Sequence, residues 1–162
     1  MNTILIISEF PEFLPERKTV GSVCMDLMVI EDVAIEPGKI KVVSAGIKTV
    51  IPMWWHAKVY ARSWLPTKQW LTLANAVAIF DADYRGEYRM QLRNISDQVV
   101  EVKKWTRVCQ IEFCPTYMPE LKIIWTPVVP ELELICDPEK YRDWELLYPT
   151  ERGSGALHST GK

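Results

Sequence analysis

The sequence predicts an all-β fold, an antiparallel sandwich or barrel with one short helix. Short segments rich in β-branched and aromatic residues follow one another along most of the chain. Turn signals built from Pro, Gly, Asn and Asp separate them at intervals of roughly ten residues, which is typical of antiparallel sheets rather than βαβ units. With 162 residues, of which 48% are hydrophobic, the chain is long enough for one domain with a buried core.

Eight segments have the composition of strands, and turn signals follow several of them. The segments are 4–7, 25–30, 40–50, 57–61, 76–80, 88–94, 99–102 and 108–113. Glu36-Pro37-Gly38, 84–87 and 94–97 are the clearest turns.

Three stretches depart from this pattern. Residues 62–68 carry charges and a proline between two predicted strands, which indicates a loop or a short helical turn. The stretch 115–149 contains six prolines and is expected to cross the surface as extended segments. Within it, Asp137 followed by Pro138 has the form of an N-cap and a first helical residue, which predicts a short helix over 138–147.

Charge and composition exclude several classes of partner. The chain has 19 basic and 21 acidic residues and a net charge of −2, so it lacks the basic field of proteins that bind nucleic acid through phosphates. No run of about 18 apolar residues is present, so no membrane association is expected. Four cysteines without a Cys-x-x-Cys pair and an N-terminus without a basic leader favour a cytoplasmic protein.

The densest polar cluster, 81–87, lies between a buried strand and an alternating one. It contains Asp81, Asp83, Tyr84 and Gly86. One interpretation is an ordinary acidic turn. The other is a site in which one carboxylate acts as a general base and the tyrosine ring supports a sugar or a base.

Two further segments have the composition of phosphate sites. Arg62, Ser63 and Lys68 supply charge and hydrogen-bond donors, although basic loops are usually only solvated. The tail from Thr150 combines glycines and hydroxyls without the order of a Walker P-loop. A frayed terminus is the alternative interpretation of this tail.

Five segments, in this order, resemble the five motifs of the trimeric dUTPase family, the dUTP diphosphatases. They are 23–27, 61–68, 75–87, 105–110 and 152–161. The resemblance implies a distorted, jelly-roll-like antiparallel β-barrel that forms a homotrimer, with each active site shared between subunits. It also implies a domain over 1–149, with an unusually long connection at 116–149, and a flexible lid over 150–162.

The implied activity is the hydrolysis of dUTP to dUMP and pyrophosphate, which removes dUTP from the nucleotide pool and supplies dUMP. By similarity, Asp81 would activate the water that attacks the α-phosphorus. Tyr84 would pack beneath the deoxyribose, and Asn75 would hydrogen-bond the uracil edge.

The other implied residues contact the phosphates, the metal or the base. Arg62, Ser63 and Gln110 would bind phosphate oxygens, and Asp26 would hold waters of a Mg²⁺ ion chelated mainly by the triphosphate. The lid would add Arg152, Leu157, Ser159 and Thr160, where Leu157 replaces the aromatic ring that stacks over uracil in the family.

Six positions carry a side chain where the family tends to have glycine. They are Cys24, Trp64, Ala78, Trp105, Ala156 and His158. At these positions the local structure of the site should differ from that of the sites in related proteins, above all where the backbone requires a positive φ.

Two alternatives to a dUTP diphosphatase are considered. The dCTP deaminases share the fold, but the position of their catalytic glutamate is Gln91 here, and an amide cannot act as that base. A nucleotide-sensing or protein-binding homologue without strong catalysis is the second, suggested by the altered lid.

Overall fold

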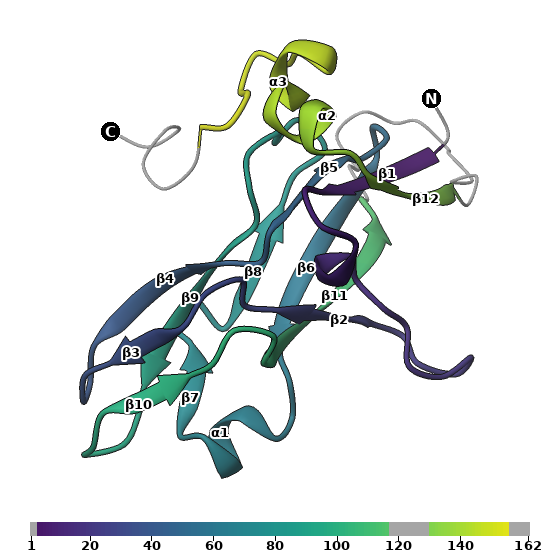
Figure 1. The fold of residues 1–162 in the computed structure, drawn as a ribbon. Coiled ribbons are helices and arrows are strands. Elements are labelled where there is room, and N and C mark those ends of the chain that lie inside the picture. Colours follow the sequence, from purple (N-terminus) through teal and green to yellow (C-terminus); the bar gives the residue numbers. More distant parts are fainter. Residues whose placement is uncertain (1–2, 117–129, 156–162) are drawn as a thin grey trace.

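The computed structural model describes residues 3–116 and 130–155. Most of these residues form short strands (Figure 1). The strands are β1 (Thr3–Ser8), β2 (Met25–Met28), β3 (Val33–Ile35), β4 (Ile40–Ser44), β5 (Ile47–Val50), β6 (Trp55–Ala61), β7 (Leu71–Leu73), β8 (Val77–Phe80), β9 (Arg89–Asn94), β10 (Val100–Val102), β11 (Arg107–Pro115) and β12 (Glu131–Cys136). An all-β fold is therefore confirmed.

These strands form four sheets and do not close into a barrel, which corrects one part of the expectation. The orders are β2-β11-β6-β8, β4-β9-β7, β12-β1-β5 and β10-β3. The consecutive strands β8 and β9 belong to different sheets, so the hairpin opens instead of continuing one surface. Among the described residues the larger of two apolar clusters lies between the sheets, with residues such as Leu27, Val59 and Ile111 fully buried.

One pairing departs from the antiparallel expectation. β1 and β12 run parallel, with Thr3 beside Glu131 and Ser8 beside Cys136. Parallel neighbours need a long connection, and these two strands come from opposite ends of the chain. Part of the expected proline-rich connection is thus the edge strand of a sheet.

The predicted strands are confirmed with small shifts of their ends, except that 40–50 divides into β4 and β5. Gly46, with φ of 66°, separates the two strands and lies against Ile30 and Phe13. A side chain there would adopt a left-handed backbone and collide with Ile30. The sequence did not predict β3, β7 or β12, of which β3 and β7 have only three residues each.

Residues 62–68, predicted to be a loop or a short helical turn, contain a short helix, so the expectation of one helix was too low: the described residues contain four short helical segments. They are η1 (Pro11–Phe13), α1 (Leu65–Lys68), α2 (Pro138–Arg142) and α3 (Trp144–Leu147). Asp137 caps α2 as predicted, its Oδ1 accepting a hydrogen bond from the Lys140 amide at 2.9 Å. The predicted helix over 138–147 divides at Asp143, which ends α2 and precedes α3.

Helices α2 and α3 pack at the β1–β5 end of the molecule through Trp144 (Figure 1). This side chain is fully buried against Leu5, Ile7 and Val50. Its Nε1 donates a hydrogen bond to the Thr49 main-chain oxygen at 3.2 Å. Trp144 therefore attaches the C-terminal segment to the sheet that contains β1.

Replacing Trp144 with alanine should lower the free energy of unfolding by about 3–5 kcal/mol, because it leaves a cavity and an unpaired Thr49 oxygen. Urea denaturation followed by circular dichroism measures this loss. Leu146→Ala is the matched control, because Leu146 is 83% exposed and should change stability little. Equal losses for the two variants would contradict the anchoring role of Trp144.

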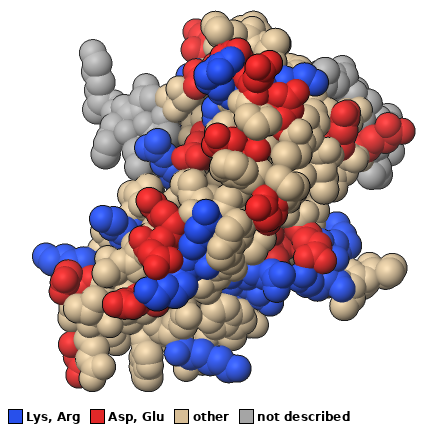
Figure 2. Space-filling view, viewed as in Figure 1, with Lys and Arg blue, Asp and Glu red and all other residues tan. Residues whose placement is uncertain are grey.

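The surface in Figure 2 carries interspersed acidic and basic side chains, in keeping with the net charge of −2. No helix in the described ranges is long and apolar enough to span a membrane.

Candidate active site

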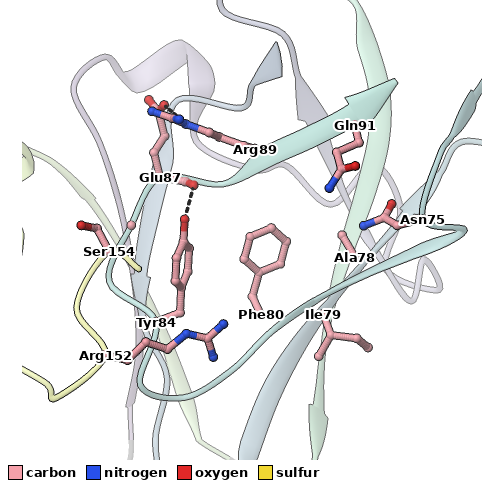
Figure 3. Close-up of a pocket in the computed structure, with 11 residues that line it drawn as sticks. Asn75, Ala78, Ile79, Phe80, Tyr84, Glu87, Arg89, Gln91, Arg152 and Ser154 are labelled. Atoms are coloured by element: carbon pink, nitrogen blue, oxygen red, sulfur yellow. Dashed lines mark hydrogen bonds and ion pairs between the residues drawn. The ribbon is translucent and has the colours of Figure 1, made fainter. Parts of the chain in front are cut away.

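The hairpin that links β8 and β9 encloses a pocket of about 470 Å³ (Figure 3). The pocket forms because the two strands leave the turn for different sheets. A volume of this size is within the range of small-molecule sites. The lining residues are Asn75, Ala78, Ile79, Phe80, Tyr84, Gly86, Glu87, Arg89, Gln91, Arg152 and Ser154.

One wall of the pocket is β8, the outermost strand of the four-stranded sheet. An outermost strand has main-chain N–H and C=O groups without strand partners on one side. Asn75 adds a carboxamide just before β8, in a turn where Ala76 has φ of 60°. This wall therefore suits the hydrogen-bonding edge of a planar base.

Tyr84 is held in the turn by its own hydroxyl and by Gly86. Its Oη donates a hydrogen bond to the Glu87 main-chain oxygen at 2.9 Å (Figure 3). A Cβ on residue 86 would lie 2.6 Å from Cζ of the Tyr84 ring, so only glycine allows this approach. Burial raises the pKa of Tyr84 and keeps it a neutral donor.

Asp81 follows β8 directly and adjoins the pocket through an ion pair with Arg152. Its side chain is half exposed, which leaves room for a water molecule beside it. The Arg152 guanidinium also lies 3.4 Å from Asp83 Oδ1 and 5.6 Å from the centre of the Tyr84 ring. The hydrogen bond to Asp81 raises the pKa of Arg152, so this side chain stays cationic.

The first residues of the tail are docked on this same turn. Thr150 Oγ1 donates a hydrogen bond to the Asp83 main-chain oxygen at 2.6 Å. The Arg85 amide donates to the Gly153 main-chain oxygen at 2.8 Å. These contacts bring Arg152 and Ser154 to the mouth of the pocket.

A second group of predicted residues lies on the sheet β2-β11-β6-β8. Asp26 on β2 and Gln110 on β11 are opposite each other in the register, and Arg62 follows β6. Arg62 Nη1 lies 3.2 Å and Arg107 Nε 3.7 Å from Asp26 Oδ2. Ser63, which is exposed, comes directly after Arg62.

The structure therefore places the predicted residues in two groups. Asn75, Tyr84 and Arg152 share the pocket with Asp81 beside it, whereas Asp26, Arg62 and Gln110 form the second group. No hydrogen bond or ion pair between described residues joins the two groups. Leu157, Ser159 and Thr160, together with Ala156 and His158, lie outside the described residues.

Three further residues line the pocket: Glu87 and Ser154 come from two of the predicted segments, 81–87 and the tail, although no role was assigned to either, whereas Arg89 was not predicted at all. Arg89 and Gln91 alternate along β9 and so share one side of the strand that forms the second wall, and Glu87 precedes them with the same spacing. This period of two was the signal that could have identified Arg89.

The backbone conformation differs between two of the positions where the family tends to have glycine, Trp64 and Trp105. Trp64 has φ of −82°, so its backbone needs no glycine. Trp105 has φ of 74°, a left-handed backbone that favours glycine. The centres of the Trp105 and Phe13 rings are 4.6 Å apart in a stacked arrangement, and Lys104 Nζ lies over the Trp105 ring. These contacts offset the strain of the left-handed backbone at Trp105.

Among the described residues, no three His, Cys, Asp or Glu side chains come together as metal ligands. One carboxylate is nevertheless suited to an outer-sphere contact. Asp26 Oδ2 is buried and, apart from its ion pairs with Arg62 and Arg107, has no hydrogen-bond partner within the described ranges. It fits a water carried by a hydrated Mg²⁺ ion, which retains several of its own waters in such sites.

Both the sequence and the fold of this chain are similar to those of known proteins. Residues 12–126 match the family model described as dUTPase. The chain is 32% identical over 149 residues to the deoxyuridine 5'-triphosphate nucleotidohydrolase of Nautilia profundicola, covering 92% of this chain and 91% of the relative. It is 35% identical over 150 residues to the protein of the same name from Desulfotalea psychrophila, covering 91% and 87%.

The fold has solved counterparts as well. The dUTPase structure from Streptococcus mutans superposes with a TM-score of 0.67 at 30% identity, covering 72% of this chain and 97% of that one. The dUTPase of phage phi11 of S. aureus superposes with a TM-score of 0.65 at 18% identity, a likeness of fold.

Proposed function

Because this chain belongs to the dUTPase family, we propose that it hydrolyses dUTP to dUMP and pyrophosphate in the pocket between β8 and β9. The observation that carries this proposal is the juxtaposition of three features. A strand edge suited to a base, a buried tyrosine ring and a half-exposed carboxylate meet at one hairpin. The reaction would remove dUTP from the nucleotide pool and supply dUMP.

Asp81 is the proposed general base. A water beside its carboxylate attacks the α-phosphorus, forming the new P–O bond while the bond to the bridging oxygen of pyrophosphate breaks. The proton of that water passes to Asp81. A positioned general base of this kind contributes about 10²–10⁴ to a rate.

Base and sugar are recognised at the walls of the pocket. Asn75 and the outer edge of β8 hydrogen-bond the uracil, and an unmatched donor or acceptor there would reject another base. Tyr84, held by Glu87 and Gly86, packs beneath the deoxyribose and leaves no space for a 2′-hydroxyl.

Arg62, Ser63 and Gln110 form the proposed phosphate side of the site. Since no hydrogen bond or ion pair among the described residues joins them to the pocket, the proposal includes a homotrimer in which one subunit supplies the pocket and another the phosphate side. Mg²⁺, chelated mainly by the triphosphate, would neutralise phosphate charge. Asp26 would accept a hydrogen bond from one of its waters.

The tail is the proposed lid. Arg152 would break its ion pair with Asp81 and bind the triphosphate instead. Ser159 and Thr160 would add hydroxyl donors to the phosphates. Leu157 in place of a stacking aromatic ring would weaken binding by about 1 kcal/mol. Closure of such a segment excludes water from the reacting centre.

The two alternatives make different predictions about products. Deamination of dCTP would need a carboxylate where the pocket presents Gln91. A nucleotide sensor would bind without turnover.

The test is incubation with each deoxynucleoside triphosphate and Mg²⁺, with pyrophosphate and ammonia measured separately. We expect pyrophosphate from dUTP and at least about a hundredfold less from the others. Ammonia from dCTP would support the deaminase, and binding without any product would support the sensor.

A further inference from the structure

We propose that Tyr141 of α2 is a positioning residue for the active site, acting through Glu87 on Tyr84. This inference rests on the proposed function, since it assigns Tyr84 to the sugar of the substrate. It also gives a role to the segment 131–148, which lies beyond the residues 12–126 matched by the family model.

The hydroxyls of two tyrosines converge on Glu87. Tyr141 Oη donates a hydrogen bond to Glu87 Oε1 at 2.6 Å. Tyr84 Oη donates to the main-chain oxygen of the same residue at 2.9 Å. Glu87 therefore transmits the position of Tyr141 to the ring that defines the sugar subsite.

Tyr141 is itself held firmly enough to serve as a reference point. Lys48 Nζ on β5 donates a hydrogen bond to the Tyr141 main-chain oxygen at 2.7 Å and lies 4.3 Å from the centre of its ring. Three residues further on, the buried Trp144 fastens the same segment to β1 and β5. Burial and the bond to Glu87 raise the pKa of Tyr141, so its hydroxyl remains a donor.

Hydrogen bonds also hold Arg85, the residue on the other side of Gly86. The buried Arg85 donates through Nε to the Tyr148 main-chain oxygen at 3.0 Å. Its Nη1 donates to the main-chain oxygens of Ala82 at 2.7 Å and Tyr84 at 3.0 Å. Both residues that flank Gly86 are thus tied to the segment that contains α2 and α3.

The turn at Gly86 needs these contacts because it has no side chain of its own at that position. Gly86 must be glycine to admit the Tyr84 ring, and a glycine contributes no side chain to hold the backbone. Support therefore comes from outside the turn. Without the Tyr141 hydroxyl, the Glu87 carboxylate would keep among the described residues only its 3.8 Å ion pair with the exposed Arg89, so Glu87 and with it the Tyr84 hydroxyl would have more than one position, and the sugar subsite would widen.

The test compares Tyr141→Phe with the wild-type protein for two sugars. We measure kcat/KM for dUTP and UTP, and the dissociation constants of dUMP and UMP by calorimetry, which needs no turnover. The preference for the deoxy sugar should fall roughly tenfold in both measurements, the scale of one hydrogen bond to a charged group. The melting temperature should fall by no more than the few degrees that one lost hydrogen bond accounts for.

Tyr148→Phe is the matched control, because its contact with Arg85 uses the main-chain oxygen and survives the substitution. It should keep the wild-type preference. A double-mutant cycle with Glu87→Ala should be non-additive, with the double variant no worse than Glu87→Ala alone.

An unchanged preference in Tyr141→Phe would overturn the inference. So would a proportional loss for both sugars with a lowered melting temperature, because that pattern indicates a merely structural role. Wild-type protein that prefers dUMP over UMP but releases no pyrophosphate from dUTP would refute the hydrolytic function instead, while the binding arm would still test Tyr141. Equal wild-type affinity for dUMP and UMP would overturn the inference.

Discussion

Replacing Asp81 with asparagine is expected to lower kcat for dUTP by about a thousandfold while leaving nucleotide binding within a fewfold of wild type. Asparagine is nearly isosteric but cannot take the proton of the attacking water. The side chain is half exposed, so the change should not disturb the core. Pyrophosphate release measures kcat, and calorimetry with a non-hydrolysable dUTP analogue measures binding.

Asp83→Asn is the control for this experiment. Asp83 lies in the same turn, is equally exposed and also faces Arg152. If the loss in Asp81→Asn came from releasing Arg152 or from local charge, both variants would be impaired to a similar degree. Comparable losses would therefore count against Asp81 as the base, whereas an effect of less than about tenfold in Asp83→Asn would support it.

The second large effect concerns Arg62. Arg62→Ala should lower kcat/KM for dUTP by about a hundredfold, because in the proposed site its guanidinium would contact a phosphate and stabilise the charge that develops there. Arg107 remains 3.7 Å from Asp26 Oδ2, so the buried carboxylate keeps one cation beside it. A thermal melt of the variant checks that the fold survives.

Mixing the two inactive variants tests whether sites are shared between subunits. Asp81→Asn and Arg62→Ala are unfolded together, refolded at equal concentration and assayed. If one subunit supplies Asp81 and another supplies Arg62, roughly a quarter of the sites in randomly mixed trimers carry both intact residues. Activity should then return to about that fraction of wild type.

Two controls make the mixing experiment decisive. Each variant refolded alone should stay inactive, and size-exclusion chromatography with light scattering gives the oligomeric state. A mixture no more active than its components would show that each subunit builds its own site.

The candidate site was predictable where several neighbours in the chain act together. Residues 80–87 join a strand end, three carboxylates, a tyrosine and a glycine, and the structure places a pocket at that hairpin. Asp137 was recognised as a cap because capping depends on residues only three apart. Strands β3 and β7 were missed and have only three residues each, although the equally short β10 was predicted.

The sequence by itself determined the all-β class, most strand positions and the residues of the hairpin, because alternation, turn chemistry and capping are local properties of the chain. Only the tertiary structure showed that β8 and β9 separate into different sheets, that β1 and β12 run parallel, and that Arg152 meets Asp81. It alone also brought Tyr141 to Glu87, 54 residues earlier in the chain. Such contacts depend on how sheets pack around a shared core, and no spacing within one segment encodes that packing.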